Sequence, residues 1–316
     1  MKIVEDIKRV IVPYEQLVEG LNLARNLGYT ELVVSTSPPY YPWEKTEIDL
    51  SKVTEYKFLE HVGISDIAPQ YAQYPINLLF LSDLPNLKSI CLNVSGDCII
   101  DFGEMKKLQK VNLPWCSQYS NFNSLSTLIE LRIVGYNKSS LEDFRQMTEL
   151  KKMILWDPTI NSLMGIDGCI SLNYMDLFRA KKLQSLKGIE RLNKLEYLHI
   201  LSCHKLLDIS AVFELENLRK LTIEKCKNIK EISLVEESNI EFLHLDSVDN
   251  LYFISKMPKL KVLFFENIEN GDLSPLLNHP TLSIVDFPNK KKYTHTRLEI
   301  VNSLENNSTL EIGASE

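Results

Sequence analysis

The sequence lacks the common motifs of enzyme active sites. It contains no phosphate-binding loop of the Walker type, no H-E-x-x-H zinc helix, no G-x-S-x-G nucleophile turn and no C-x-x-C pair. Those motifs hold phosphates, metal ligands or nucleophiles in a fixed geometry. Without them the sequence favours a protein that is not an enzyme, and we expect no catalytic residue, no metal and no cofactor.

The sequence also lacks an excess of basic charge. It has 42 acidic against 35 basic side chains, a net charge of −7. The run Lys290–Lys292 is too short to change that balance and is typical of a solvated surface. Proteins whose main ligand is nucleic acid usually carry a basic face, so nucleic acid is excluded as the principal partner.

Long apolar segments are missing as well. No run approaches the ~20 residues that cross a bilayer, and Met1–Asp6 is charged where a secretory signal would be expected. We therefore predict a cytoplasmic, monomeric protein with no membrane contact. The six cysteines are interpreted as reduced thiols; they are Cys91, Cys98, Cys116, Cys169, Cys203 and Cys226.

A repeat dominates what is present. Residues 195–229 read LEYLHILSCHKLLDISAVFELENLRKLTIEKCKNI, which is one pattern, L-x-x-L-x-L-x-x-C, written twice with a shift of 23 residues. The first, fourth and sixth positions form a short strand whose leucines point into a narrow core, while the intervening residues face outward. The ninth position, Cys203 or Cys226, marks the turn off the strand, where a thiol can reach unpaired backbone groups.

This pattern resembles the leucine-rich-repeat family, in its irregular, cysteine-containing form. Strand starts recur every 20 to 23 residues, at Leu87, Leu108, Leu128, Leu150, Leu172, Leu195, Leu218, Ile240, Leu260 and Leu282. The resemblance implies an α/β fold, a right-handed solenoid with a curved parallel sheet on its concave face. Such short periods leave room only for short helices or 3-10 turns on the convex face, for example at 143–147 and 209–213.

Three regions follow from the extent of the repeat. Residues 1–50 are predicted to be an N-terminal cap with a helix over 14–26 after Pro13, a stop at Gly28 and a strand over 31–35; the prolines at 38–42 break regular structure. Residues 51–290 form the solenoid. Residues 291–316 form a C-terminal cap, with a helix over 296–304 and a loose polar tail over 306–316.

The register between 50 and 86 stays open. Leu59, Val62 and Ile64 fit a degenerate first repeat. Ile76, Leu79 and Leu81 offer another candidate strand, but it lies only about half a repeat before the next one.

The outward positions of the strands are the candidate binding surface. Large aromatic side chains with nearby charged groups gather there, a composition typical of protein-binding hot spots. An alternative is that some rings fold back and pack within the chain. The predicted partner-binding residues are Trp115, Arg132, Tyr136, Trp156, Tyr174, Asp176, Phe178, Arg179, Tyr197, His199, Phe242, His244 and Phe264. A row of acids (Glu224, Asp246, Glu266, Asp286) suggests either a partner with a basic flank or simple solubility.

Two arrangements that could carry chemistry are set aside. Cys203 and His204 are adjacent, but neighbours near a strand point to opposite sides. His199 and His244 occupy equivalent positions two coils apart, roughly 10 Å at strand spacing, which is too far for one metal ion. A bound metal or cofactor, or a buried His–carboxylate pair, would reveal an enzyme whose site the motifs do not show.

The ending Leu282–His295 resembles that of some bacterial cytosolic leucine-rich-repeat proteins, and some of those are similar to immunity proteins that neutralise a toxin. The function predicted is non-catalytic binding of a partner protein on the concave face. The resemblance implies, as its narrower form, a bacterial immunity protein that covers a basic toxin domain. The alternative is a substrate-recognition or scaffolding subunit of a larger complex.

Overall fold

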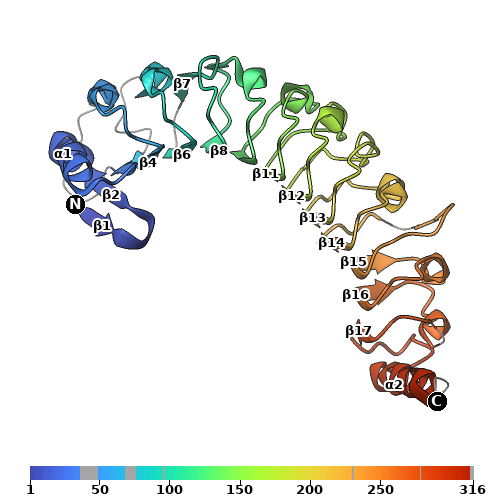
Figure 1. The fold of residues 1–316 in the computed structure, drawn as a ribbon. Helices are drawn as coiled ribbons and strands as arrows, with labels where there is room; N and C mark the ends of the chain where they lie inside the picture. Colours follow the sequence, from blue (N-terminus) through green and yellow to red (C-terminus); the bar gives the residue numbers. More distant parts are fainter. Residues whose placement is uncertain (36–48, 68–75, 95–96, 230, 278, 314–316) are drawn as a thin grey trace. The chain divides into compact units, whose positions relative to one another are not determined.

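The computed structural model describes residues 1–35, 49–67, 76–94, 97–229, 231–277 and 279–313 (Figure 1). The proline-rich segment expected to break regular structure, 38–42, lies outside these residues. The chain divides into two compact units. Unit 1 comprises 1–136 and 143–153, and unit 2 comprises 137–142 and 154–316.

Unit 1 is built on a sheet that begins with an antiparallel pair, β1 (Lys2–Val4) and β2 (Arg9–Pro13), separated by the 3-10 turn η1 (Glu5–Ile7). Parallel strands follow in the order β2, β3 (Glu31–Ser35), β4 (His61–Ile67), β6 (Ser89–Val94), β8 (Lys110–Pro114) and β10 (Glu130–Val134). The predicted first repeat around Leu59, Val62 and Ile64 is confirmed as the coil of β4, with all three side chains buried.

The N-terminal helix and strand are also confirmed. A 3-10 turn η2 (Tyr14–Gln16) leads into α1 (Leu17–Leu27), which ends at Gly28 with φ +67°. Strand β3 has the predicted bounds, and it pairs in parallel with β2 so that α1 is the crossover between them. Strands β1 and β2 were not predicted.

Unit 2 carries the regular repeats. Its strands are all parallel and lie in the order β12 (Tyr174–Phe178), β13 (Tyr197–Leu201), β14 (Lys220–Glu224), β15 (Phe242–Val248), β16 (Val262–Ile268) and β17 (Ile284–Asp286). Strand β11 (Lys152–Trp156) has residues in both units. The register places Tyr197 opposite Tyr174 and Lys220, as the repeat alignment predicts.

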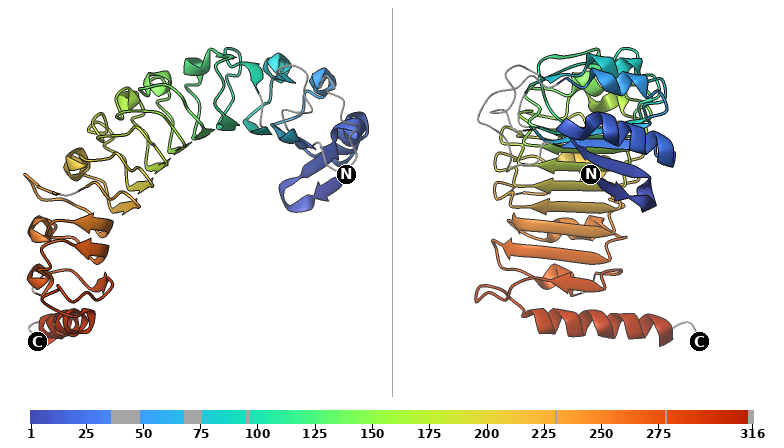
Figure 2. Two further views of the ribbon diagram at one scale, coloured as in Figure 1. Left: turned by 180° about the vertical axis from the view of Figure 1, so that it is seen from behind. Right: turned by 90° about the vertical axis from the view of Figure 1, so that its left-hand side faces the viewer.

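Short 3-10 turns fill the return segments, on the side of each unit away from the sheet (Figure 2). In unit 1 they are η3 (Ser51–Glu55), η5 (Leu79–Asp83) and η6 (Phe122–Ser124); η7 (Glu142–Phe144) has residues in both units; in unit 2 they are η8 (Ile166–Gly168), η9 (Ser210–Glu214), η10 (Tyr252–Lys256) and η11 (Ser274–Leu276). The predicted fold class, a right-handed α/β leucine-rich-repeat solenoid with 3-10 turns, is confirmed.

The open register before Leu87 is resolved by a second, small sheet in unit 1. This sheet has the order β5 (Ile76–Asn77), β7 (Cys98–Asp101) and β9 (Tyr119–Ser120). Ile76 therefore belongs to β5, while Leu79 and Leu81 lie in η5. The idea that these three residues form a strand of the main sheet is wrong, since they belong to a return segment.

The ninth-position cysteines act in the turn as predicted. In the two matching coils the residue that directly follows the strand has a positive φ; it is Ser202 (59°) after β13 and Lys225 (55°) after β14. The backbone N–H of Cys203 donates to Sγ of Cys226 at 3.3 Å, and the Cys226 thiol lies 3.3 Å from the carbonyl oxygen of Glu224. Both thiols are buried, so they satisfy backbone groups that water cannot reach.

The C-terminal helix α2 (Arg297–Gly313) begins with a capping box. Thr296 N–H donates to Glu299 Oε2 at 2.7 Å, and Glu299 N–H donates to Thr296 Oγ1 at 3.3 Å. Ile300 and Leu304 are buried, which confirms a helical cap. The predicted loose tail over 306–316 is wrong for 306–313, because a helix once nucleated extends with one hydrogen bond per added residue. No helix in the described part of the chain is both long and apolar enough to cross a membrane.

Candidate functional site

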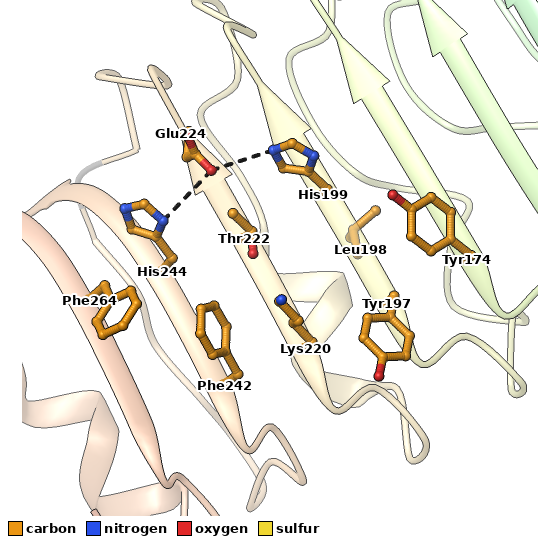
Figure 3. Close-up of a pocket in the computed structure, with 10 residues that line it drawn as sticks. All are labelled: Tyr174, Tyr197, Leu198, His199, Lys220, Thr222, Glu224, Phe242, His244 and Phe264. Atoms are coloured by element: carbon orange, nitrogen blue, oxygen red, sulfur yellow. Dashed lines mark ion pairs between the residues drawn. The ribbon is translucent and has the colours of Figure 1, made fainter. Parts of the chain in front are cut away.

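The outward side chains of strands β12 to β16 in unit 2 form one surface, which we call the sheet-face site (Figure 3). Along each strand these side chains alternate with buried ones, and the parallel register aligns them in rows. They surround a pocket of about 460 Å³. Its lining residues are Tyr174, Tyr197, Leu198, His199, Lys220, Thr222, Glu224, Phe242, His244 and Phe264.

Aromatic rings provide the apolar part of the site. The rings of Tyr174 and Tyr197 are stacked with centroids 6.3 Å apart, and those of Phe242 and Phe264 meet edge to face at 5.4 Å. Tyr197 is 45% exposed. Between the two pairs, the ammonium group of Lys220 lies 4.5 Å from the centre of the Phe242 ring, a cation–π geometry. All four rings are among the residues that the sequence placed on the outward face of the strands.

A ladder of acids and imidazoles runs beside the rings. His199 Nδ1 lies 3.5 Å from Asp176 Oδ1, and His199 Nε2 lies 3.6 Å from Glu224 Oε1. The same Glu224 oxygen lies 3.7 Å from His244 Nδ1 (Figure 3). We call Asp176, His199, Glu224 and His244 the acid–imidazole ladder. In it, two histidines that strand spacing puts roughly 10 Å apart share one carboxylate.

The ladder changes the titration of its central histidine. The pKa of His199 is raised, first by its hydrogen bond with Asp176 and then by the negative charges of Asp176 and Glu224, while burial and Lys220 oppose the shift. The pKa of Tyr174 is also raised, by burial and by the Asp176 charge. Histidine protonation is therefore coupled to the two carboxylates on either side of it.

A second aromatic pair lies at the turn end of the strands in unit 2. The rings of Trp156 and Phe178 are 5.3 Å apart, and the guanidinium of Arg179 lies 4.6 Å from the Phe178 ring centre. Arg179 also forms a 2.6 Å ion pair with Asp157. These predicted site residues are together and partly exposed, but they already contact one another.

Two predicted residues of unit 1 belong to its interior. Tyr136 is 0% exposed, its hydroxyl donates to Asp143 Oδ2 at 3.0 Å, and its ring packs against Phe144. Trp115 is half-buried, and its ring centre lies 4.6 Å from that of Tyr136. The prediction that Tyr136 lies on the exposed face is wrong, because it occupies the inward ninth position of its coil, and Trp115 folds back onto it. Arg132, at a fifth position in unit 1, is half-buried.

The predicted row of acids is largely used within the chain. Glu224 contacts the two histidines, Asp246 accepts a 2.5 Å hydrogen bond from the Cys226 N–H, and Asp286 pairs with Arg297. Glu266 is exposed on β16. The contact of Glu224 with the two histidines was not predicted; its place in the row suggested only a basic flank on the partner or solubility.

The His–carboxylate contact requires a comparison with hydrolytic triads, in which the histidine also binds a hydroxyl or thiol nucleophile. Thr222 lies opposite both histidines in the strand register. In the described parts of the chain its hydroxyl forms no hydrogen bond with either, and the Cys203 thiol is buried near backbone carbonyls. Over those same residues, no group of three or more His, Cys, Asp or Glu side chains could hold a metal ion.

No protein-family model and no curated protein matches the chain. Among solved structures, the chain is similar to an internalin, inlF, of Listeria monocytogenes, at 13% identity and a TM-score of 0.52 over 87% of this chain and 73% of that one. The functional domain of InlJ from Listeria monocytogenes, described as including a cysteine ladder, matches at 18% identity and a TM-score of 0.54, over 88% of this chain and 65% of that one. A Leptospira interrogans LRR protein matches at 16% identity and a TM-score of 0.43, over 88% and 82%.

The chain has a leucine-rich-repeat fold. At these identities the likeness establishes the fold alone, and what the sheet-face site of this leucine-rich-repeat chain binds must be argued from its own residues.

Proposed function

We propose that the protein is a non-catalytic binding protein that holds a partner protein on the sheet-face site of unit 2. The observation that carries the proposal is the alignment of partly exposed aromatic rings beside titratable side chains on consecutive parallel strands. Aromatic anchors flanked by charged groups provide most of the energy in protein–protein interfaces. The strands hold them in place, so little conformational entropy is lost on binding.

The extent of the surface supports a macromolecular partner. From β12 to β16 the site crosses five strands, about 19 Å at strand spacing. A small molecule would cover one part of it, whereas a protein surface would cover both ring pairs and the ladder together. We place the protein in the cytoplasm as a monomer; its six free thiols, five of them buried, support a reducing compartment.

The narrower form of the proposal is that the partner is a basic toxin domain and the protein its bacterial immunity protein. Its support is the resemblance of the C-terminal segment and the net charge of −7, which would speed encounter with a basic partner. Since Asp246 and Asp286 are engaged within the chain, local attraction would rest on Glu224 and Glu266. Co-expression with a toxin gene encoded beside it would test this; unchanged toxicity would rule out the narrower form.

Capture from native cell extract tests the general proposal. The wild type is compared with Tyr197→Ala/Phe242→Ala, which removes one ring from each pair, and with a control, Leu207→Ala/Tyr252→Ala. The control residues are exposed side chains outside the strands. Circular dichroism and thermal unfolding would first establish that all three proteins are folded.

We expect one specific protein to be retained by the wild type and the control and to be lost with the site variant. A partner that is retained equally by all three proteins would show that the sheet-face site is not where it binds. A partner lost only with the control variant would place the binding surface on the side of unit 2 that carries the return segments.

A further inference from the structure

The carboxylate of Glu224 occupies an unusual position in the sheet-face site. It is the last residue of β14 and the seventh position of its repeat; its side chain is 36% exposed, and one of its oxygens faces both His199 and His244. Asp176 faces the other nitrogen of His199. Among the described residues, imidazoles are the only bases within ion-pair distance of either carboxylate.

The strand geometry keeps Lys220 from neutralising these acids. Lys220 and Glu224 are four residues apart on β14, which is about 13 Å along an extended strand. The ammonium group lies instead over the Phe242 ring. When both imidazoles are neutral, the acid–imidazole ladder therefore carries two negative charges beside an apolar wall, with no permanent cation paired to them.

We propose that the acid–imidazole ladder binds a cationic side chain of the partner, an arginine or a lysine, and releases it when His199 and His244 are protonated. The inference rests on the proposed function for its partner and specifies what that partner presents. The cationic head would pair with Glu224 in place of water, and Asp176, on the far side of the His199 ring, would attract it at longer range. Its alkyl stem would lie on the rings of Phe242 and Phe264, because long basic side chains cover apolar surface while the charge stays at a polar site.

Protonation opposes this binding in two ways. An imidazolium ion satisfies the Glu224 oxygen that the incoming cation needs, and it repels that cation as a like charge. His199 is faced by Asp176 from β12 and by Glu224 and Lys220 from β14. His244 is faced by Glu224 from β14 and by the ring of Phe264 from β16, and the centroids of the His244 and Phe264 rings are 6.0 Å apart. Since the pKa of His199 is raised from its ordinary value, mainly by Asp176, release begins at a higher pH than an isolated histidine would give.

Linkage makes the effect measurable without the natural partner. If protonation of an imidazole weakens cation binding tenfold, then a bound cation lowers that imidazole's pKa by one unit. The probe is the dipeptide acetyl-Arg-Leu-amide, and its matched control is the same dipeptide with citrulline, which is neutral and of nearly equal shape. The ring signals of His199 and His244 in the full chain, assigned with His→Gln variants, report both binding and protonation by NMR.

We expect the arginine probe to shift both ring signals saturably at pH 8.5, to bind at least about tenfold more weakly at pH 5.5, and to lower the pKa of His199 by about one unit, as linkage requires. The citrulline probe should leave the signals unchanged. Equal responses to the two probes, no response to the arginine probe, or equal affinities at the two pH values would each overturn the inference.

Variants separate the charges involved. Glu224→Gln should abolish arginine binding at pH 8.5, whereas Glu236→Gln, at an exposed acid outside the strands of unit 2, should leave it unchanged. His199→Gln/His244→Gln should bind about equally at both pH values. Arginine binding that survives Glu224→Gln, or a pH effect that survives the double histidine change, would contradict the assignment.

Failure here and failure of the proposed function look different. A captured partner that depends on Tyr197 and Phe242 but is unaffected by Glu224→Gln or by pH would refute the cation site and leave the binding function intact. A capture experiment insensitive to Tyr197 and Phe242 would refute the proposed function, and the probe titration would still decide the cation site independently.

Discussion

Replacing Gly188 by alanine should destabilise unit 2 through contact between neighbouring coils. Gly188 has φ +108°, a conformation that side chains with a Cβ rarely adopt. A Cβ built there would lie 2.5 Å from both the carbonyl carbon and oxygen of Leu163 and 2.6 Å from the nitrogen of Met164. All three are backbone atoms of the preceding coil, and the coil is held there by the hydrogen bond from Leu163 N–H to Lys187 O at 2.9 Å.

The expected cost has two parts. Holding a non-glycine residue at this φ costs about 1–3 kcal/mol, and forcing a methyl group into a packed contact costs about 1–3 kcal/mol more. Gly135 is a matched control, since it has φ +76° and nothing within 4 Å of its added Cβ; Gly135→Ala should cost only about 1–2 kcal/mol. The entropy that alanine removes from the unfolded chain is the same in both variants and cancels in the comparison.

Urea denaturation followed by circular dichroism measures both variants. Gly188→Ala should lower the free energy of unfolding by about 2–6 kcal/mol, a large share of the 5–15 kcal/mol typical of domains. Equal losses for Gly188→Ala and Gly135→Ala would refute the reasoning, because the close approach of the coils would then carry no cost.

Two further predictions concern buried polar groups in unit 2. Burial lowers the pKa of His279, whose Nδ1 accepts from Leu282 N–H at 3.2 Å while Nε2 lies 3.1 Å from Ile254 O. The pKa of His279 in the folded protein lies below its unfolded value of about 6.5. The stability that the neutral, buried imidazole contributes is therefore fully present above pH 6.5 and is lost as the pH falls through the folded pKa. His279→Gln should flatten the decline of the urea midpoint below pH 6.5, and an unchanged slope would contradict this. Cys226→Ala removes the buried acceptor of the Cys203 N–H and should cost about 1–3 kcal/mol in the same assay; a loss within about 0.5 kcal/mol, the usual effect of a surface change, would count against the hydrogen bond.

The repeat made most of unit 2 predictable. Leucines at fixed spacing determine which residues face inward, and a strand alternates its side chains between two faces. The alignment of Tyr174, Tyr197 and Lys220 in one row therefore follows directly from the period. The N-terminal strands β1 and β2 were missed because β1 has only three residues and β2 ends at Pro13, which was read as the start of a helix.

The errors in the site have a different origin. Tyr136 was assigned to the surface from its aromatic character, although its ninth position is the one that points inward in Cys203. The contact of His199 and His244 with one Glu224 oxygen depends on side-chain rotamers and not on strand spacing. Strand spacing therefore gave only the separation between His199 and His244, which does not show that both contact the same carboxylate.

Photo-crosslinking shows directly whether a partner protein lies against the sheet-face site. A photoreactive phenylalanine analogue would replace Tyr197, which is on the sheet-face site, or Leu207, which is exposed on a return segment. Each protein would be irradiated in native extract, and the crosslinked products identified by mass spectrometry. We expect one discrete protein to crosslink from position 197, to be competed away by unlabelled wild type, and not to crosslink from position 207. If the same protein crosslinks from position 207 and not from position 197, the partner does not bind on the sheet-face site.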